Sequence, residues 1–181
     1  MAPKAAAAHM QQSGDDQVEF ESAVREHQGL VYSMAYHFIG NRAIAEDMAQ
    51  EVFLSLYRNF SNIKSGSHLV FWLRKVTSHR CLDYLRGQKR RGYLSLEEVR
   101  ERPIIHQDPD PFLTGHLRRM VTSLPEKARI VVVLRYQEDL TPTEIAEILE
   151  MPVNSVKSHL RRSLALLREK MSSRLRKDSH E

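Results

Sequence analysis

The segment Thr141–Glu169 fits two short helices separated by a sharp break. Thr141 and Glu144 have the spacing of a capping box, in which each side chain satisfies a free backbone N–H at the helix start. Pro142 suits the first turn of that helix, where its missing N–H would have no partner anyway. Pro152 marks the break, since proline disfavours helical backbone angles in the residue before it. The segment therefore predicts a helix, a turn and a second helix.

The second helix of this segment is predicted to be capped by Asn154 or Ser155. Its apolar residues recur at steps of four, four and three: Val156, Leu160, Leu164 and Leu167. This spacing leaves polar and basic residues facing outward in the first two turns: Lys157, Ser158, His159, Arg161 and Arg162. A helix-turn-helix presents the start of its second helix to DNA in this way. The pattern predicts DNA binding, and the alternative is a helical hairpin with a solvated basic face.

Charge is gathered in segments along the chain. Residues 74–91 hold seven bases and one acid, and residues 154–177 hold eight bases and one acid. Between them, residues 92–114 hold two bases and five acids. Two basic segments separated by an acidic one indicate two contacts with a polyanion, each made by its own element.

The first half of the chain is predicted to hold three helices. Apolar residues recur at steps of three and four over residues 17–39, and residues 40–41, Gly-Asn, supply a stop and a new N-cap. A second helix follows and ends near residue 59. Residues 61–67 have the composition of a loop, and a third helix is expected over residues 68–87.

The second half begins with an acidic stretch that contains three prolines, which predicts a flexible linker over residues 93–112. Two more helices are expected before Thr141. The run Ile130–Leu134 taken alone resembles a buried strand, but no partner strand is predicted elsewhere. Ser123 and Glu126 match a capping box, which favours a helix there.

The predicted fold is all-α, with two small helical domains joined by a flexible linker. The expected divisions are a disordered tail over 1–16, a helical bundle over 17–92, the linker over 93–112 and a helix-turn-helix domain over 113–175.

Composition excludes several classes of protein. The chain has no apolar run long enough for a membrane span and no secretory signal, and its single cysteine, Cys81, fits a reducing compartment, so a cytoplasmic protein is expected. The nine histidines are scattered, and the sequence contains no metal-ligand cluster, phosphate-binding glycine loop or nucleophile motif. We expect no enzyme, no cofactor and no small-molecule substrate.

Two further segments carry a resemblance to a known family: AEDMAQEVFLSLYRNF, residues 45–60, and FWLRKVTSHRCLDYLRGQKRRG, residues 71–92. With the L-P-E-x-x-R helix that precedes the helix-turn-helix, the chain resembles the sigma-70 family of RNA polymerase sigma factors. It is most similar to group IV, the extracytoplasmic-function (ECF) type, which has only regions 2 and 4. The resemblance covers about residues 18–168 and implies a transcription initiation factor that reads the minus-10 and minus-35 promoter elements and aids promoter melting.

The resemblance implies roles for residues of the first half. The D-x-x-Q-E-x-F motif implies contact with core RNA polymerase through these residues: Asp47, Gln50, Glu51, Phe53 and Leu54. The loop and third helix imply contact with the minus-10 element through these residues: Lys64, Ser65, Gly66, Ser67, His68, Arg74, His79, Arg80, Asp83, Arg86, Lys89, Arg90 and Arg91. Many relatives carry Asn where this chain has His79, which leaves base preference there open. Trp72 is expected in the core, with a base-stacking role as the alternative.

The resemblance also implies contact with the minus-35 element through the start of the last helix: Ser155, Lys157, Ser158, His159, Arg161 and Arg162. The expected partners are core RNA polymerase, promoter DNA and an anti-sigma factor. Alternatives from other classes are a repressor or response regulator ending in a helix-turn-helix, and an adaptor that binds polymerase without reading promoters. The first lacks a strand pattern for a receiver domain, and the second does not explain basic residues in both halves.

Overall fold

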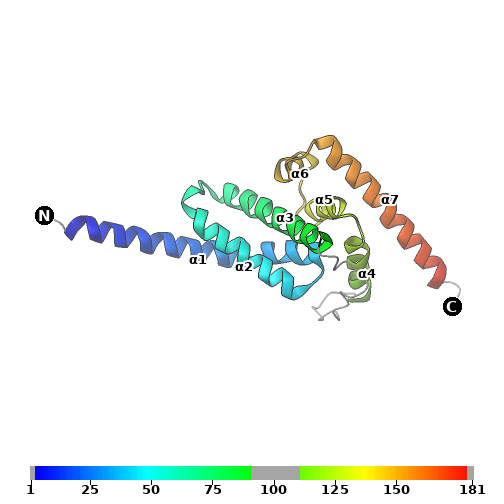
Figure 1. The fold of residues 1–181 in the computed structure, drawn as a ribbon, viewed down its shortest axis with the longest axis horizontal. Helices are drawn as coiled ribbons and strands as arrows, with labels where there is room; N and C mark the ends of the chain where they lie inside the picture. The colour runs from blue at the N-terminus through cyan, green and yellow to red at the C-terminus, as the bar shows by residue number, and fades with distance from the viewer. Residues whose placement is uncertain (1–2, 91–110, 179–181) are drawn as a thin grey trace.

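The computed structural model describes the backbone of residues 3–90 and 111–178, and the side chains of residues 17–90, 115 and 117–172 (Figure 1). The first half consists of these elements: α1 (Pro3–Ile39), α2 (Arg42–Asn59), the 3-10 turn η1 (Phe60–Asn62) and α3 (Gly66–Arg90). The second half consists of these: α4 (Pro111–Thr122), α5 (Glu126–Tyr136), α6 (Pro142–Leu149) and α7 (Val153–Asp178). The described residues contain no strand, which confirms the all-α fold.

Helix α1 is longer than the sequence pattern indicates. It begins at Pro3, so most of the segment that we expected as a disordered tail, residues 1–16, belongs to this helix. The alanine run over residues 5–8 has the highest helix propensity of any composition, and it continues the helix beyond the amphipathic part. The predicted linker, 93–112, lies outside the described residues except for its last two positions, which open α4.

The boundary between α1 and α2 lies at the predicted Gly-Asn pair. Gly40 has a φ of +82°, a conformation that glycine adopts without steric cost. Asn41 then caps α2, because its side-chain oxygen accepts a hydrogen bond of 3.0 Å from the N–H of Ile44. The reversal brings the end of α1 and the start of α2 together.

Two predicted caps are wrong. The Ser123 hydroxyl donates to the carbonyl of Met120, and α5 follows Pro125 without a side-chain cap. Helix α7 begins at Val153, so Asn154 and Ser155 lie within its first turn and do not precede it. In both cases a proline stands directly before the helix, and its fixed φ already prepares the backbone for helical geometry.

Helix α5 confirms the helical alternative for Ile130–Leu134. All five residues are buried, which explains why the run resembles a strand: a helix covered on every side has no polar face to reveal its period.

The two halves share one hydrophobic cluster. The first half contributes Met34, Ala35, Phe38, Ile39, Ala45, Met48, Cys81, Leu82 and Leu85. The second half contributes Ile130, Val131, Leu134, Leu140, Ile145, Ala146, Ile148, Leu149 and Val156. Figure 1 shows α3 between α2 on one side and α5 and α6 on the other. A second cluster, made by α1, α2 and α3 alone, has Trp72 packed against it, in agreement with the expected core position.

Candidate nucleic-acid interface

Helices α6 and α7 have the geometry of a helix-turn-helix. The predicted capping box is present: the Thr141 N–H donates to Glu144 Oε2 at 2.8 Å, and the Glu144 N–H donates to Thr141 Oγ1 at 3.3 Å. Hydrogen bonds from the Thr141 side chain and backbone lower the pKa of the Glu144 carboxyl. After α6 the chain turns at Glu150, whose φ is +51°. The Met151 N–H then donates to the carbonyl of Ala146, which closes the turn.

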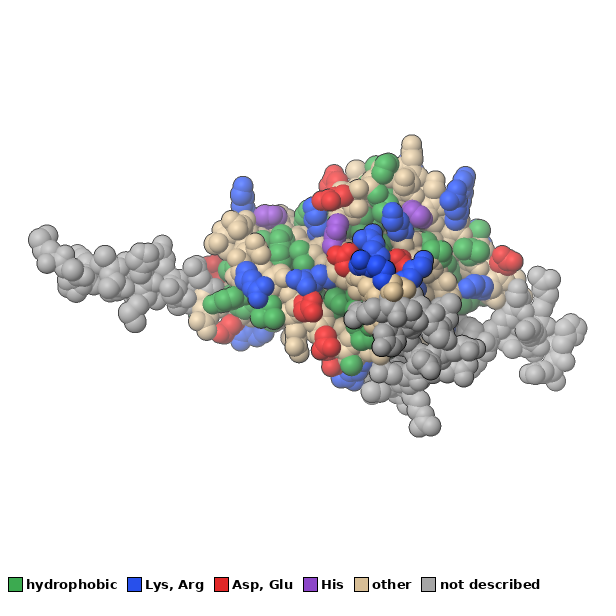
Figure 2. Space-filling model, in the orientation of Figure 1, with side chains coloured by type: hydrophobic (Ala, Val, Ile, Leu, Met, Phe, Trp, Pro, Cys, Tyr) green, Lys and Arg blue, Asp and Glu red, His purple; other side chains and the backbone are tan. Residues whose placement is uncertain are grey.

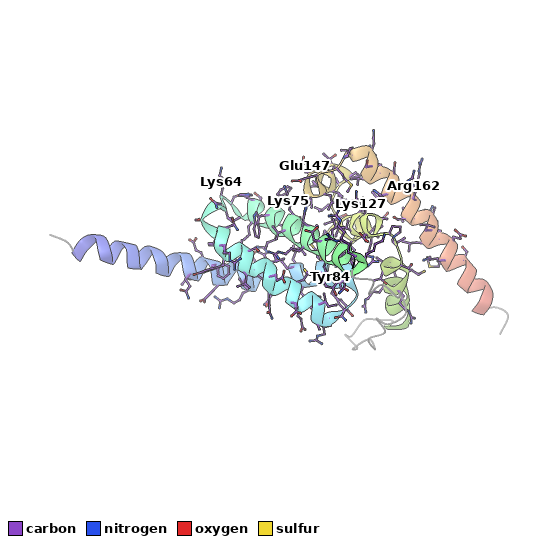
Figure 3. All side chains as sticks on the ribbon, in the orientation of Figure 1. Lys64, Lys75, Tyr84, Lys127, Glu147 and Arg162 are labelled. Atoms are coloured by element: carbon purple, nitrogen blue, oxygen red, sulfur yellow. The ribbon has the colours of Figure 1, made fainter. Side chains whose placement is uncertain are left out.

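The first turns of α7 hold the predicted minus-35 residues together. Val156 and Leu167 are buried, and Leu160 and Leu164 are half-buried, so this side of the helix packs inward. The predicted residues divide by exposure: Lys157, Arg161 and Arg162 are exposed, whereas Ser155, Ser158 and His159 are half-buried. Burial, followed by the charges of Lys127 and Arg162, lowers the pKa of His159. Figure 3 shows Arg162 projecting away from the neighbouring helices.

The start of α3 is a capped helix end. The Ser65 hydroxyl accepts a hydrogen bond of 3.1 Å from the N–H of His68, and His68 Nδ1 accepts one of 3.2 Å from the N–H of Lys64. Gly66 and Ser67, which the sequence predicts in a loop, belong with His68 to the first turn of α3. The exposed polar groups at this end are therefore held in one geometry.

The middle of α3 faces the second half of the chain. Arg74 Nε lies 3.0 Å from Glu138 Oε2, and His79 Nε2 lies 3.1 Å from the carbonyl oxygen of Ile148. Lys75 Nζ lies 2.6 Å from Glu150 Oε1, on the side of α3 that faces α6 (Figure 3). Sequence reasoning missed Lys75, although its place in the basic segment beside Arg74 could have signalled it.

Other predicted minus-10 residues point elsewhere on α3. Arg80 reaches α2, where its guanidinium donates to Glu51 at 2.6 Å and to the Ser55 hydroxyl at 2.6 Å. Asp83 and Arg86 form an exposed ion pair of 3.1 Å. Lys89 and Arg90 are exposed at the end of the helix, and Arg91 lies outside the described residues. Figure 2 shows Lys and Arg side chains interspersed with Asp and Glu side chains on the face of the molecule turned to the viewer.

An open groove of about 830 Å³ runs between α1 and α2. Three of the predicted polymerase-binding residues line it: Gln50, Phe53 and Leu54. The opposite wall comes from α1, through residues that include Phe20, Val24 and Tyr32. Leu54 and Tyr57 are 58% and 64% exposed, which is unusual for large apolar side chains.

The remaining predicted polymerase-binding residues, Asp47 and Glu51, are exposed on α2 outside this lining. The predicted set thus combines an apolar wall with acidic and amide groups on one helix. This combination suits a protein interface with an apolar centre and a polar rim.

No helix in the described part of the chain is long and apolar enough to cross a membrane. The described side chains also form no group of three or more His, Cys, Asp or Glu residues that could hold a metal ion.

Family comparisons divide the chain at the same place as the structure. The model for Sigma-70 region 2 matches residues 23–91, which span α1 to α3, and the model for Sigma-70, region 4, matches residues 115–167. The chain is 30% identical over 162 residues to the RNA polymerase sigma-E factor of Streptomyces avermitilis, covering 87% of each chain. It is 28% identical over 169 residues to the ECF RNA polymerase sigma factor SigW of Bacillus subtilis, covering 86% of this chain and 90% of SigW.

Solved structures share the fold. The sigma factor RpoE of Bartonella quintana, in complex with the anti-sigma factor NepR, matches with a TM-score of 0.71 and 17% identity over 85% of this chain and 97% of RpoE. CnrH, in complex with the cytosolic domain of CnrY, matches with a TM-score of 0.62 and 17% identity over 91% of this chain and 94% of CnrH. The chain belongs to the sigma-70 family of RNA polymerase sigma factors, in the extracytoplasmic-function group.

Proposed function

We propose that this chain binds core RNA polymerase and directs it to a limited set of promoters, reading a minus-10 element with α3 and a minus-35 element with α7. The observation that carries the proposal is the presence of one basic helix in each half, within a chain that matches both sigma regions. Arginine and lysine side chains suit both roles, because they neutralise phosphates and can donate to base edges. The protein acts in the cytoplasm, where it meets the polymerase.

The polymerase contact is assigned to the exposed side of α2. Asp47, Gln50 and Glu51 supply hydrogen-bonding groups, and Phe53 and Leu54 supply apolar area beside the groove. Truncation of a hot-spot residue in such an interface costs about 2 kcal/mol or more of binding free energy. Asp47→Ala and Gln50→Ala should therefore weaken binding to core polymerase, whereas Glu147→Ala, at an exposed position on α6, should not.

The minus-35 contact is assigned to the first two turns of α7. Arg162→Ala should reduce selectivity for the upstream element while core binding stays unchanged, because the side chain projects from α7 and is remote in sequence from α2. Arg168→Ala, an exposed position later on the same helix, is the matched control. A loss of core binding in Arg162→Ala would reverse the assigned roles.

The decisive experiment is reconstitution. Purified chain and cognate core polymerase should initiate transcripts from a small number of sites on genomic DNA fragments, and each component alone should not. If no combination with cognate core enzyme yields initiation, the proposed function is wrong.

We further propose an anti-sigma protein as a regulatory partner. Support comes from the RpoE structure, which contains the anti-sigma factor NepR, and from the CnrH structure, which contains the cytosolic domain of CnrY. Co-purification of a tagged chain from its own cells, followed by identification of the bound protein, tests this directly. Recovery of polymerase subunits alone, under conditions where the chain is inactive, would contradict it.

A further inference from the structure

Three contacts join α3 to α6 and to the two turns that flank it. The turn before α6 supplies Glu138, which pairs with Arg74 at 3.0 Å. The turn after α6 supplies Glu150, which pairs with Lys75 at 2.6 Å. Between them, the carbonyl of Ile148 at the end of α6 lies 3.1 Å from His79 Nε2. The three residues of α3 lie at steps of one and four, on one side of the helix.

Two of these contacts place a carboxylate against a cationic side chain of α3. A guanidinium or ammonium group donates to carboxylate and phosphate oxygens in the same way, so a donor engaged by one is withheld from the other. The Arg74–Glu138 pair is well shielded, with side-chain exposures of 22% and 7%. The Lys75–Glu150 pair is more open and contributes less.

The closed packing rests on more than ion pairs. The Arg129 guanidinium donates to the carbonyl of Phe38 at 3.0 Å, and Arg118 donates to the Tyr36 hydroxyl at 2.8 Å. Both contacts join the end of α1 to the second half, beside the shared hydrophobic cluster. The arrangement is therefore a packed interface, and the pairs on α3 form part of its border.

The start of α7 differs from α3 in the contacts of its basic side chains. Lys157, Arg161 and Arg162 are exposed, and none of them takes part in an ion pair between described side chains. The closed arrangement thus engages Arg74, Lys75 and His79 of α3 and leaves the basic start of α7 open.

We propose that the closed packing is an autoinhibited state in which Glu138 and Glu150 occupy the α3 side chains that would otherwise grip single-stranded minus-10 DNA. The inference rests on the proposed DNA-binding role of α3 and adds its regulation. Strand binding requires α6 to leave α3, so apparent affinity is reduced by the fraction of chains that are open. The minus-35 surface of α7 needs no such opening.

Glu138→Gln in the full chain tests the proposal. The substitution keeps the size of the side chain but leaves the partly buried Arg74 charge without a partner in the closed state. The free-energy cost of this unpaired charge is absent in the open state, where Arg74 is exposed to water. Because the pair is partly exposed, we expect an increase of about tenfold in the open population and in affinity for single-stranded DNA. Glu147→Gln removes the same charge from an exposed position on α6 and is the matched control.

Two measurements are made on each variant. Energy transfer between dyes at Asn62→Cys and Thr143→Cys, in a Cys81→Ala background, reports separation of α6 from the first half without DNA. Fluorescence anisotropy of a labelled 30-nucleotide single strand of random sequence reports affinity at low salt. Glu138→Gln should decrease energy transfer and tighten strand binding, and Glu147→Gln should match the parent chain in both.

Equal gains in affinity for the two variants would show that the gain comes from the change in net charge alone, and this would overturn the proposal. Unchanged energy transfer in Glu138→Gln, or opening without a gain in affinity, would also overturn it. Reconstituted transcription tests the proposed function separately. A chain that opens and gains affinity but never supports initiation would contradict that function and leave the masking of α3 standing.

Discussion

Replacing Arg129 with methionine should lower the thermal stability of the chain by several degrees. Arg129 is only 9% exposed and faces no carboxylate at hydrogen-bonding distance among the described residues. Its guanidinium donates instead to three backbone carbonyls, at Phe38, Thr122 and Leu124. These carbonyls lie at or just beyond the ends of α1 and α4, where helix carbonyls lack partners within the helix and the helix dipole favours a cation.

The magnitude follows from two opposing effects. Burial lowers the pKa of Arg129 from 12.5 to about 10, and Glu126 opposes this only in part. At 1.36 kcal/mol per pKa unit, the cost of burying the charge is about 3 kcal/mol. Three hydrogen bonds from a charged donor contribute roughly 1.5–3 kcal/mol each. The side chain should therefore stabilise the folded chain by about 3 kcal/mol, since the bonds outweigh the burial.

Methionine keeps the apolar length of the side chain and removes the charge and its hydrogen bonds together. For a chain of this size, about 3 kcal/mol corresponds to a decrease of about 6–12 °C in the midpoint of thermal unfolding. Arg135→Met is the matched control on the same helix, because the Arg135 side chain is 36% exposed, its bond to the Leu140 carbonyl is only partly buried and its bond to Asp139 is exposed. Calorimetry or circular dichroism measures both variants.

The control should lose no more than about 1 kcal/mol. If Arg129→Met melts within about 2 °C of Arg135→Met, the three bonds only compensate the burial of the charge. The inference that Arg129 stabilises the junction of α1, α4 and α5 would then be refuted.

Thr141→Ala should destabilise the chain by about 1 kcal/mol through loss of the cap on α6. The pKa of Glu144 is lowered in the folded state, so the stabilisation from its ionised carboxylate is present above pH 4.5 and is lost as pH falls. The unfolding midpoints of variant and parent should therefore converge in acid, and a difference that stays constant with pH would contradict this. Gly40→Ala should lower the free energy of unfolding, measured with denaturant, by about 1–2 kcal/mol. Alanine is strained at a φ of +82°, and its Cβ would lie 3.0 Å from Thr122 Cγ2. A variant as stable as the parent chain would show that the α1–α2 corner relaxes freely. Burial raises the pKa of the Cys81 thiol to about 12, so this thiol should resist a thiol reagent at pH 8 until the chain is unfolded. Rapid reaction with the folded protein would show that the surroundings of Cys81 open.

The helices could be predicted from the sequence wherever one face is apolar and a cap or breaker marks the end. The Gly-Asn corner at 40–41 and the capping box at Thr141 lie where the pattern indicated, because both depend on interactions within a few residues. The caps predicted at Ser123 and Asn154 are wrong for the same local reason, since a neighbouring proline sets each helix start. The start of α1 was missed because alanine forms helix without an amphipathic pattern.

The predicted site residues remain proposals, and what the sequence could not indicate is how they pair. The resemblance implied DNA contacts for Arg74 and Arg80, yet Arg74 meets Glu138, which is 64 positions away in the chain, and Arg80 meets Glu51. Such pairs depend on the packing of distant helices, which no local pattern encodes. The groove between α1 and α2 was missed for the same reason, because five of its eleven lining residues come from α1, a helix to which the motif gave no role.

The shared hydrophobic cluster also limits how such chains can be recombined. Phe38 and Leu85 from the first half pack in one interior with Leu134 and Ile148 from the second. The faces that meet there must fit each other at the density of a protein core, where a change of one methylene is felt. A hybrid that joins residues 1–91 of this chain to the corresponding second half of a relative would therefore bring together surfaces that were never matched. Swapping promoter preference between relatives by exchanging whole halves should cost stability, whereas exchanging only the exposed residues of α7 should not.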